Sequence, residues 1–361
     1  MSVGALIVGG GPAGAAAAIT LARAGAPHLL VERRRETGDA LCGGFLSWRT
    51  LETLAALGVS ADELNREPVT QVRLFAGKRV SSARLPRPAV AVSRRRLDSI
   101  LLERAVNAGS RIERGVSARA VDGVSVRLDD GAILTGDALF LASGKHDVRG
   151  LARPAEARAG DPTLGLRVRL PAHPALDRLV GDAVELHLFD RGYAGAARQE
   201  DGSVNLCLAV RRSRLHEAGD AAALLDMLAA GSPRLAERLA FGHGPVDAVA
   251  NVPYGWRAAA APAGVFRLGD QAGVIPSLAG EGMGIALASG VDAARAWLRD
   301  GAAPWQAGFA RRIARPIAIA DAIRTTAERP ALAARALPLL AAAPFLIRIV
   351  ARAPRLGDVA T

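Results

Sequence analysis

Three glycines near the start of the chain have the spacing of a turn that binds a dinucleotide, Gly9-x-Gly11-x-x-Gly14. The first glycine permits a tight turn, the second lets the backbone approach a pyrophosphate, and the third lets a helix pack close to a strand. That helix then points its positive N-terminal end at the phosphates. Pro12 and Ala13 lie inside the same turn, so we expect all five residues to contact a cofactor.

The segments around these glycines have the order that such a turn requires. An apolar strand at residues 5–8 precedes them, and a strongly helix-forming stretch follows at 15–24. A second strand at 28–31 ends in Glu32, and a carboxylate at that position accepts ribose hydroxyls and disfavours a 2′-phosphate. This order of strand, turn, helix, strand and acid indicates a site for FAD or NAD rather than NADP, and we place Arg33 beside it.

Residues 264–290 form a second glycine-rich segment, far along the chain. A strand at 265–268 leads to Gly269-Asp270, and a turn rich in glycine then enters a new helix. In flavoproteins with a split FAD domain, an aspartate at this position holds the ribityl chain, and the helix N-terminus faces the flavin ring. The two segments together favour FAD. The residues of the second segment that we expect to contact it are Gly269, Asp270, Pro276, Gly280, Gly282, Met283 and Gly284.

Both segments, with residues 92–98 between them, resemble the geranylgeranyl reductase family. That family is part of the para-hydroxybenzoate-hydroxylase-like flavoprotein superfamily, and the resemblance covers most of residues 3–300. Residues 41–47, Leu-Cys-Gly-Gly-Phe-Leu-Ser, look like the family's Cys-Gly-rich loop beside the flavin, and Arg94 matches the family arginine near the cofactor. The FAD contacts that the resemblance adds are Cys42, Gly43 and Arg94.

We expect an α/β fold, with a Rossmann-like (GR2-type) FAD-binding domain, an inserted antiparallel β-sheet substrate domain and a helical C-terminal region. The FAD-binding domain includes a helix at 94–109 and a buried strand at 138–142. The chain after this strand reaches Gly144, which we expect to contact the cofactor. Short alternating strands predict a sheet that roofs the flavin, at 164–170, 184–189 and 204–210. The expected boundaries are 1–70, 90–150 and 256–300 for the FAD domain, 71–89 and 151–255 for the substrate domain, and 301–361 for the C-terminal region.

Departures from related families bear on the substrate. Aromatic hydroxylases usually carry Asp-Gly followed by a serine and an arginine in mid-chain, whereas residues 142–147 read Ala-Ser-Gly-Lys-His-Asp, which favours the reductase branch. Prenyl reductases typically show a Tyr-x-Trp-x-Phe-Pro run over the substrate, and residues 193–198 keep only the tyrosine. The substrate is therefore not copied from the family. The residues expected to line its cavity are Phe45, Tyr193, Tyr254 and Trp256.

Cys42 and Tyr193 are the candidate catalytic side chains. A positioned Cys42 thiol can donate a proton to a substrate carbon, although a small buried cysteine that only packs is the plainer interpretation. The expected reaction is hydride transfer from reduced flavin to a double bond of a small prenyl, polyketide or aromatic substrate. A monooxygenase that hydroxylates an aromatic or polyketide ring, and a flavin-binding electron-transfer protein, are the alternatives. No second dinucleotide fingerprint occurs, so NAD(P)H or another donor would act as a transient reductant.

Composition restricts the partners and the compartment. The formal net charge is +11, but aromatic residues make up only 4% of the chain, which disfavours nucleic-acid binding and leaves anionic substrates or a membrane surface. Two cysteines provide neither a disulfide framework nor a metal cluster, and no metal is expected. The first residues lack a signal peptide's basic region and cleavage site, so we expect a cytoplasmic protein. The sequence does not indicate the oligomeric state.

The segment from residue 302 onward differs from the rest. Its helices are rich in Ala, Leu and Arg, and we expect breaks at Pro316, Pro330, Pro338, Pro344 and Pro354. A nearly apolar stretch at 337–350 overlaps and precedes a set of arginines, Arg348, Arg352 and Arg355. Such a segment can lie on the inner face of a membrane, cover the substrate cavity, or simply pack on the domain. The sequence leaves these alternatives open.

Overall fold

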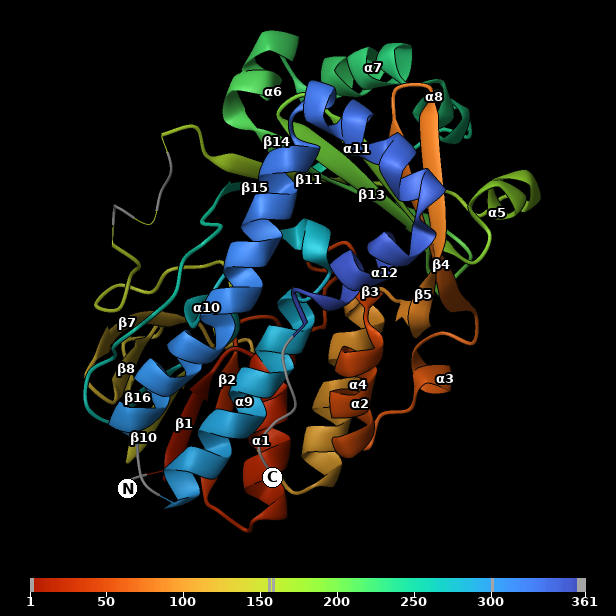
Figure 1. Ribbon diagram of the computed structural model, residues 1–361. Helices are drawn as coiled ribbons and strands as arrows, with labels where there is room; N and C mark the ends of the chain where they lie inside the picture. The colour runs from red at the N-terminus through yellow and green to blue at the C-terminus, as the bar shows by residue number, and fades with distance from the viewer. Residues whose placement is uncertain (1–2, 155–156, 158–159, 300–301, 356–361) are drawn as a thin grey trace.

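The computed structural model describes residues 3–154, 157, 160–299 and 302–355, and its described strands form three sheets (Figure 1). Sheet A is parallel, in the order β16-β10-β1-β2-β6. Helices pack on one of its faces and the small sheet C packs on the other, so β1 is buried throughout. The strands of sheet A are β1 (Ala5–Val8), β2 (His28–Glu32), β6 (Arg111–Arg114), β10 (Ala138–Leu141) and β16 (Val265–Arg267). Those of sheet C are β7 (Ala118–Asp122), β8 (Ser125–Leu128) and β9 (Ile133–Thr135).

The helices on sheet A position the loops at its carboxyl edge. The helix predicted at 94–109 is confirmed as α4 (Arg94–Asn107), which the Ser93 side chain caps by accepting a hydrogen bond from Arg96 N. The other helices of this region are α1 (Pro12–Arg23), α2 (Trp48–Ala56), α3 (Ala61–Leu64) and α9 (Gly282–Arg299).

Sheet B has eight strands in the order β15-β11-β14-β13-β12-β4-β5-β3. The predicted antiparallel sheet is confirmed with one difference, because β4 and β12 pair in parallel. A long excursion through sheet A separates these strands in the chain, so no hairpin constrains their relative direction. The strands are β3 (Phe45–Leu46), β4 (Pro68–Ala76), β5 (Arg79–Ala91), β11 (Thr163–Leu170), β12 (Ala183–Phe189), β13 (Gly192–Arg198), β14 (Val204–Arg211) and β15 (Asp247–Val252).

The two faces of sheet B have different partners. Apolar side chains of β11 and β14 on one face form a core with a group of short helices. The other face is turned toward the carboxyl edge of sheet A and toward the C-terminal helices (Figure 1). The short helices are α5 (Pro174–Val180), α6 (Arg212–Ala218), α7 (Ala221–Gly231) and α8 (Pro233–Leu239).

The C-terminal region consists of α10 (Ala302–Ala327), α11 (Pro330–Ala342) and α12 (Pro344–Arg352). The breaks predicted at Pro316 and Pro338 are wrong, since both prolines lie inside helices. Pro330 and Pro344 instead stand at the first helical position, where a missing N–H costs no hydrogen bond. Figure 1 shows α10 running from the level of sheet A to sheet B, with α11 and α12 folding back across β5. Among the described residues, no helix has the length and apolar character needed to cross a membrane.

Candidate functional site

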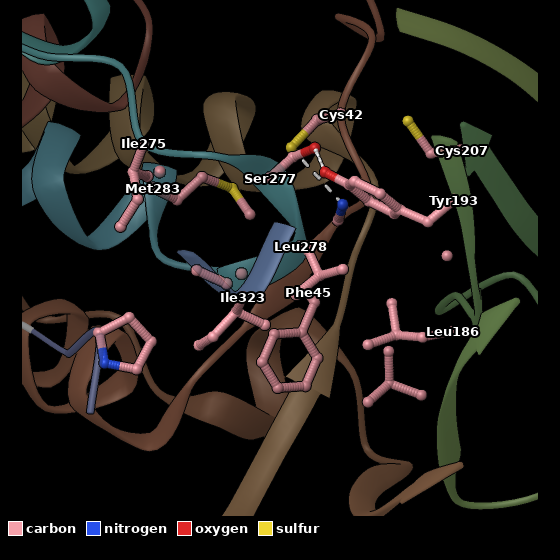
Figure 2. A pocket seen from close by; sticks show the side chains of 18 of the residues that line it. Cys42, Phe45, Leu186, Tyr193, Cys207, Ile275, Ser277, Leu278, Met283 and Ile323 are labelled. Carbon is pink, nitrogen blue, oxygen red and sulfur yellow. Dashed lines mark hydrogen bonds between the residues drawn. The ribbon is translucent and has the colours of Figure 1, made fainter. Parts of the chain in front are cut away.

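A cavity of about 630 Å³ lies between the carboxyl edge of sheet A and the inner face of sheet B. Its walls come from the turn after β1, residues 41–45, strands β12 to β14, and the segment from Leu268 to Met283. Most of the lining side chains are aliphatic or aromatic. Figure 2 shows Cys42, Tyr193 and Ser277 grouped at one part of the cavity, with Phe45 and Leu186 in another.

The glycine turn after β1 leaves space for a ligand at only one of its three glycines. Gly9 has a φ of +105°, and a Cβ there would lie 2.5 Å from the Ala142 carbonyl oxygen. A Cβ at Gly14 would lie 1.9 Å from the Gly9 carbonyl oxygen. At Gly11 the nearest atom would be Arg94 Nη2, at 3.5 Å. The outer two glycines therefore serve the fold, and Gly11 faces open space in front of α1, as a pyrophosphate requires.

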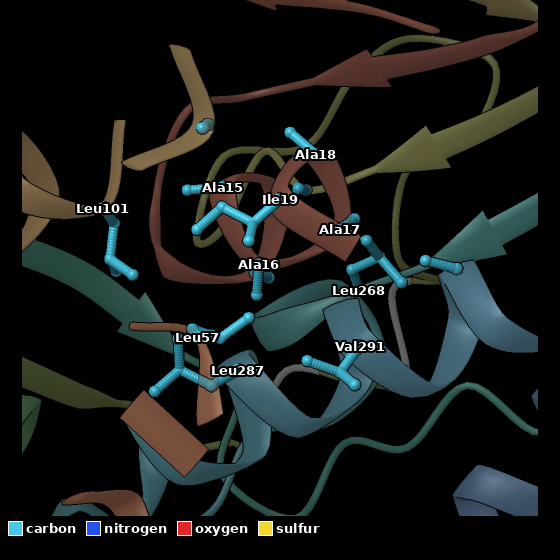
Figure 3. Close-up of a cluster of buried hydrophobic side chains, with 14 of the residues drawn as sticks. Ala15, Ala16, Ala17, Ala18, Ile19, Leu57, Leu101, Leu268, Leu287 and Val291 are labelled. Carbon is cyan, nitrogen blue, oxygen red and sulfur yellow. The ribbon is translucent and has the colours of Figure 1, made fainter. Parts of the chain in front are cut away.

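Close packing of small residues fixes α1 against α9. A Cβ at Gly290 would lie 2.2 Å from the Ala13 carbonyl oxygen, so the two helices touch through backbone. Figure 3 shows the alanines of α1 against Leu287, Val291 and Leu268 in the same core. Both helices begin at residues that border the cavity, so their positive N-terminal ends are held there.

Glu32 and Arg33 lie behind the turn rather than on the cavity wall. The Glu32 carboxylate accepts hydrogen bonds from Gly10 N at 2.7 Å and Arg34 N at 2.9 Å, which braces the turn. Arg33 Nη2 lies 2.8 Å from His146 Nε2. Burial, followed by the charges of Arg33 and other basic neighbours, lowers the pKa of His146, so this ring is neutral at physiological pH.

Arg94 provides a fixed positive charge on the cavity wall. Its Nε and Nη2 donate to the two oxygens of Asp98, at 2.9 and 2.7 Å. Burial lowers the pKa of Arg94, but the Asp98 carboxylate, with smaller contributions from Cys42 and Asp270, outweighs this effect and raises the pKa. The guanidinium thus stays charged and oriented near both of these residues.

Residues 268–283 of the second glycine-rich segment form another wall of the cavity. Gly269 N donates to Ser289 Oγ at 2.8 Å, and the Asp270 carbonyl accepts from Arg153 Nη1 at 3.0 Å. Asp270 also lines the cavity. Gly280 has a φ of +63°, and a Cβ there would press on the Phe45 ring at 2.7 Å. Gly282 and Met283 also line the cavity, whereas Pro276 and Gly284 do not.

Backbone from four loops can approach a ligand in this cavity. Gly11, Gly43, Gly144 and Gly282 border it, and a Cβ at any of them would have no protein atom nearer than 3.5 Å. Two helix N-termini and the Arg94 cation face the same space. This cradle, with an apolar compartment beyond it, suits a ligand that combines phosphates with a planar ring, and FAD fits that description.

Two cysteines line the cavity, Cys42 on its loop and Cys207 on β14. Gly44 N donates to Cys42 Sγ at 3.5 Å, and Asn205 Nδ2 donates to the Cys42 and Gly43 carbonyls at 3.0 and 3.1 Å. Sheet B therefore holds the Cys42 loop in place. Burial, and then the charge of Cys42, raise the pKa of the Cys207 thiol to about 12, which keeps Cys207 protonated.

Tyr193 and Tyr254 meet at one hydroxyl. Both phenol oxygens lie 2.6 Å from Ser277 Oγ, and all three residues line the cavity. Tyr193 is buried, while Tyr254 is partly exposed and lies under the Arg324 guanidinium at 5.9 Å. Burial raises the pKa of Tyr193 well above its ordinary value.

Comparisons with known proteins agree with this geometry. Residues 2–138 match a family described as an FAD binding domain. Digeranylgeranylglycerophospholipid reductase 2 of Methanopyrus kandleri is 29% identical over 319 residues, which cover 80% of this chain and 75% of that relative. The chain is an FAD-dependent oxidoreductase that is similar in sequence to this reductase.

Solved structures share the fold of this flavoenzyme. A geranylgeranyl bacteriochlorophyll reductase-like protein from Thermoplasma acidophilum superposes with a TM-score of 0.74 at 18% identity, covering 97% of this chain and 96% of that one. PqsL, a probable FAD-dependent monooxygenase from Pseudomonas aeruginosa, superposes with a TM-score of 0.72 at 20% identity, covering 93% and 99%. The same architecture therefore occurs in proteins named as reductases and as a monooxygenase.

The predicted substrate residues of the flavoenzyme divide into two groups. Phe45, Tyr193 and Tyr254 line the cavity. Trp256 does not, because its indole Nε1 is turned toward the Gln271 carbonyl, to which it donates at 3.3 Å.

The C-terminal helices of the flavoenzyme form a wall of the cavity. Their lining side chains include Ile323, Leu337, Leu340 and Ile347. Arg355 fastens the end of this wall, since its Nη1 donates to the Gly280 carbonyl at 3.1 Å and to Glu281 Oε2 at 2.5 Å. Two of the alternatives that the sequence left open are observed together, since these helices pack on the domain and also line the cavity.

The sequence did not predict the contacts that Ser277 and Arg355 make at the site. Ser277 directly follows Pro276 in the second glycine-rich segment, so its place beside the cofactor site could have been found there. Arg355 had no local signal, because its partner Glu281 lies 74 residues away in the chain.

Proposed function

We propose that this flavoenzyme reduces a carbon–carbon double bond in a small hydrophobic substrate of the prenyl, polyketide or aromatic class. The observation that carries the proposal is the single cavity of about 630 Å³ in which the cofactor cradle continues into an apolar compartment. The aliphatic and aromatic lining of the compartment beyond the cradle suits an apolar substrate. The name of the 29% identical relative, a digeranylgeranylglycerophospholipid reductase, supports an alkene as the reacting group.

Residues of this chain would hold FAD as follows. The backbone at Gly11 and the N-terminus of α1 would bind the pyrophosphate, and Asp270 would accept a hydrogen bond from the ribityl hydroxyls. Arg94 keeps a positive charge near Cys42 and Asp270. When bound and reduced, FAD would supply the hydride for one carbon of the double bond, and NAD(P)H or another donor would be its transient reductant.

The second carbon needs a proton, and the chain offers two sources. The Cys42 thiol lies on the cavity wall beside Arg94, where it can donate directly. The Tyr193 phenol is hydrogen-bonded through Ser277 to the more exposed Tyr254, so this chain of hydroxyls can return a proton from the surface. We assign donation of the proton to the Cys42 thiol. The hydroxyls of Tyr193, Ser277 and Tyr254 would then return a proton to Cys42.

Two features argue against the two other functions, namely the C-terminal wall and the position of Cys42 at the cavity. An electron-transfer protein needs a cofactor edge that is open to a partner, and here Ile323, Leu337 and Ile347 cover the apolar compartment. A hydroxylase would need no thiol donor at Cys42. We also propose that the FAD domain, the sheet domain and the C-terminal region are the three units of the chain.

Anaerobic reoxidation tests the proposal. The purified enzyme is reduced under nitrogen and mixed with prenyl, polyketide and aromatic alkenes in turn, while the flavin absorbance is followed. We expect a hydrophobic alkene to reoxidise the cofactor without oxygen. Reoxidation that occurs only when dioxygen is admitted, with an oxygen atom in the product, would assign the enzyme to the monooxygenases.

A further inference from the structure

Helix α12 has an apolar and basic face that no part of the described chain covers. Phe345, Arg348, Ile349 and Arg352 follow one another at the spacing of one helix face, and all four are exposed. Phe345 retains 59% of its surface and Ile349 retains 55%. Single exposed apolar residues are common, but apolar residues gathered on one exposed face mark an interaction surface.

Helix α11 continues this face. Leu332, Arg335 and Leu339 are exposed at matching helical positions, and Leu339 retains 67% of its surface. We call these three residues and the four of α12 the outer face. From Pro330 to Arg352 the chain contains three arginines and no acidic residue. Among the described residues, no acidic side chain pairs with any of these arginines.

The opposite side of the same helices is buried against the enzyme. Ile347 packs on the core formed with β4 and β5, and Leu337 is buried at the cavity. Arg355 ties the end of α12 to Glu281, immediately before α9. The outer face is therefore not the side by which these helices pack on the enzyme, because Leu337 and Ile347 on the other side already make those contacts.

The outer face borders an opening of the cavity. Leu339 lines the cavity although two thirds of its surface is exposed, and Thr326 at the end of α10 is likewise both exposed and lining. The apolar compartment thus reaches the molecular surface between α10 and α11, next to the apolar residues of the outer face.

We propose that the outer face of α11 and α12 docks on an anionic lipid bilayer and that the cavity opens toward the lipid at Leu339. Helices that bind the plane of a bilayer alternate apolar side chains with arginine or lysine in this way, because the apolar groups enter the acyl region while the cations meet anionic headgroups. A second copy of the chain is a poorer partner, since it would place three arginines against three arginines. Entry of the substrate from the bilayer rests on the proposed function, whereas docking itself does not.

Vesicle binding by the FAD-loaded enzyme tests the proposal. Sedimentation is compared between vesicles of phosphatidylcholine alone and vesicles with equal parts phosphatidylcholine and phosphatidylglycerol. The variants are Phe345→Ser/Ile349→Ser and Arg348→Gln/Arg352→Gln. Matched controls are Val106→Ser/Ile133→Ser, which removes side chains that are 55% and 61% exposed on other surfaces, and Arg119→Gln/Arg149→Gln.

We expect the wild-type enzyme to bind the anionic vesicles more tightly than the neutral ones, and salt to weaken that binding. Each arginine of the outer face contributes about fivefold, so the double arginine variant binds about 25-fold more weakly. The Phe345→Ser/Ile349→Ser variant loses binding as well, while both controls keep it. Unchanged FAD absorbance in every variant shows that the fold is intact.

Three results would overturn the proposal: no binding of the wild type to anionic vesicles, an equal loss of binding in the controls, or a wild-type dimer that the outer-face variants dissociate. The last result would assign the outer face to a second copy of the chain. Vesicle binding without alkene-dependent reoxidation would leave docking in place and remove the proposed function instead.

Discussion

The phenol oxygen of Tyr193 lies 2.6 Å from the hydroxyl oxygen of Ser277, across the join between sheet B and the second glycine-rich segment. The contact links a strand at the centre of sheet B to the loop that leads into α9. Since Tyr254 bonds the same hydroxyl and is more exposed, three hydroxyls connect the buried wall with the surface.

Tyr193 is expected to stay protonated at a pH where an ordinary tyrosine is ionised. The chain has only two tyrosines, so NMR of protein labelled at the tyrosine Cζ gives two signals, which Tyr193→Phe and Tyr254→Phe assign. The Tyr193 signal should not shift as the pH passes about 10, the usual tyrosine pKa. Because the folded state holds this proton more tightly than the unfolded state does, the free energy of unfolding falls as the pH rises above that value. A Tyr193 signal that titrates at its ordinary pKa contradicts the buried geometry.

Gly11→Val should leave a folded protein that lacks FAD. A Cβ at Gly11 meets only Arg94 Nη2 at 3.5 Å, so the valine fits the fold but occupies the space where phosphate would approach the backbone. Gly14→Ala is the contrasting variant, because its Cβ would lie 1.9 Å from the Gly9 carbonyl oxygen and the fold itself should suffer. Thermal unfolding and flavin content of the purified proteins separate the two effects. A Gly11→Val enzyme with full FAD content would show that the cradle is misplaced.

Asp270→Ala should weaken FAD binding by about tenfold to a hundredfold. A hydrogen bond to a charged group contributes roughly 1.5–3 kcal/mol, and the Asp270 side chain lines the cavity with its carbonyl already held by Arg153. Asp226→Ala, on the exposed surface of α7, is the control. Fluorescence titration of the apoprotein with FAD gives the dissociation constants. Equal values for Asp270→Ala and the control would remove the ribityl contact.

Cys42→Ser should slow alkene reduction strongly while FAD binding and cofactor reduction stay near normal. Serine keeps the size and hydrogen bonds of the residue, but its hydroxyl is a far weaker acid than a thiol. Cys207→Ser is the matched control, because Cys207 lines the same cavity with a pKa of about 12. The measurement is the single-turnover rate at which the alkene reoxidises the reduced cofactor in the wild type, in Cys42→Ser and in Cys207→Ser. If both variants react at the wild-type rate, Cys42 is a packing residue.

Local patterns predicted the cofactor end of the molecule well. The turn at Gly9, Gly11 and Gly14, and the strand, turn and helix around Gly269, depend on neighbours in the sequence, and the structure places both at one cavity. Pro316 was misleading because packing of α10 on the core offsets the lost hydrogen bond and the steric clash that a proline inside a helix causes.

Contacts between distant segments could not be predicted. The parallel pairing of β4 with β12 and the position of β13 between β12 and β14 depend on how the chain closes sheet B. The meeting of Tyr193 with Ser277, and of Arg355 with Glu281, joins residues that are 84 and 74 positions apart. Trp256 was expected in the cavity only because it is aromatic, and nothing in its neighbours showed that its indole would turn to Gln271.

If the enzyme adds hydrogen to a double bond, the mass of the product records that addition. The enzyme is reduced anaerobically and mixed with one equivalent of a hydrophobic alkene, and a parallel sample receives dioxygen labelled with heavy oxygen. We expect a product that gains two hydrogen atoms for each cofactor oxidised, with no labelled oxygen in either sample. A product that forms only with dioxygen and carries the label would contradict it.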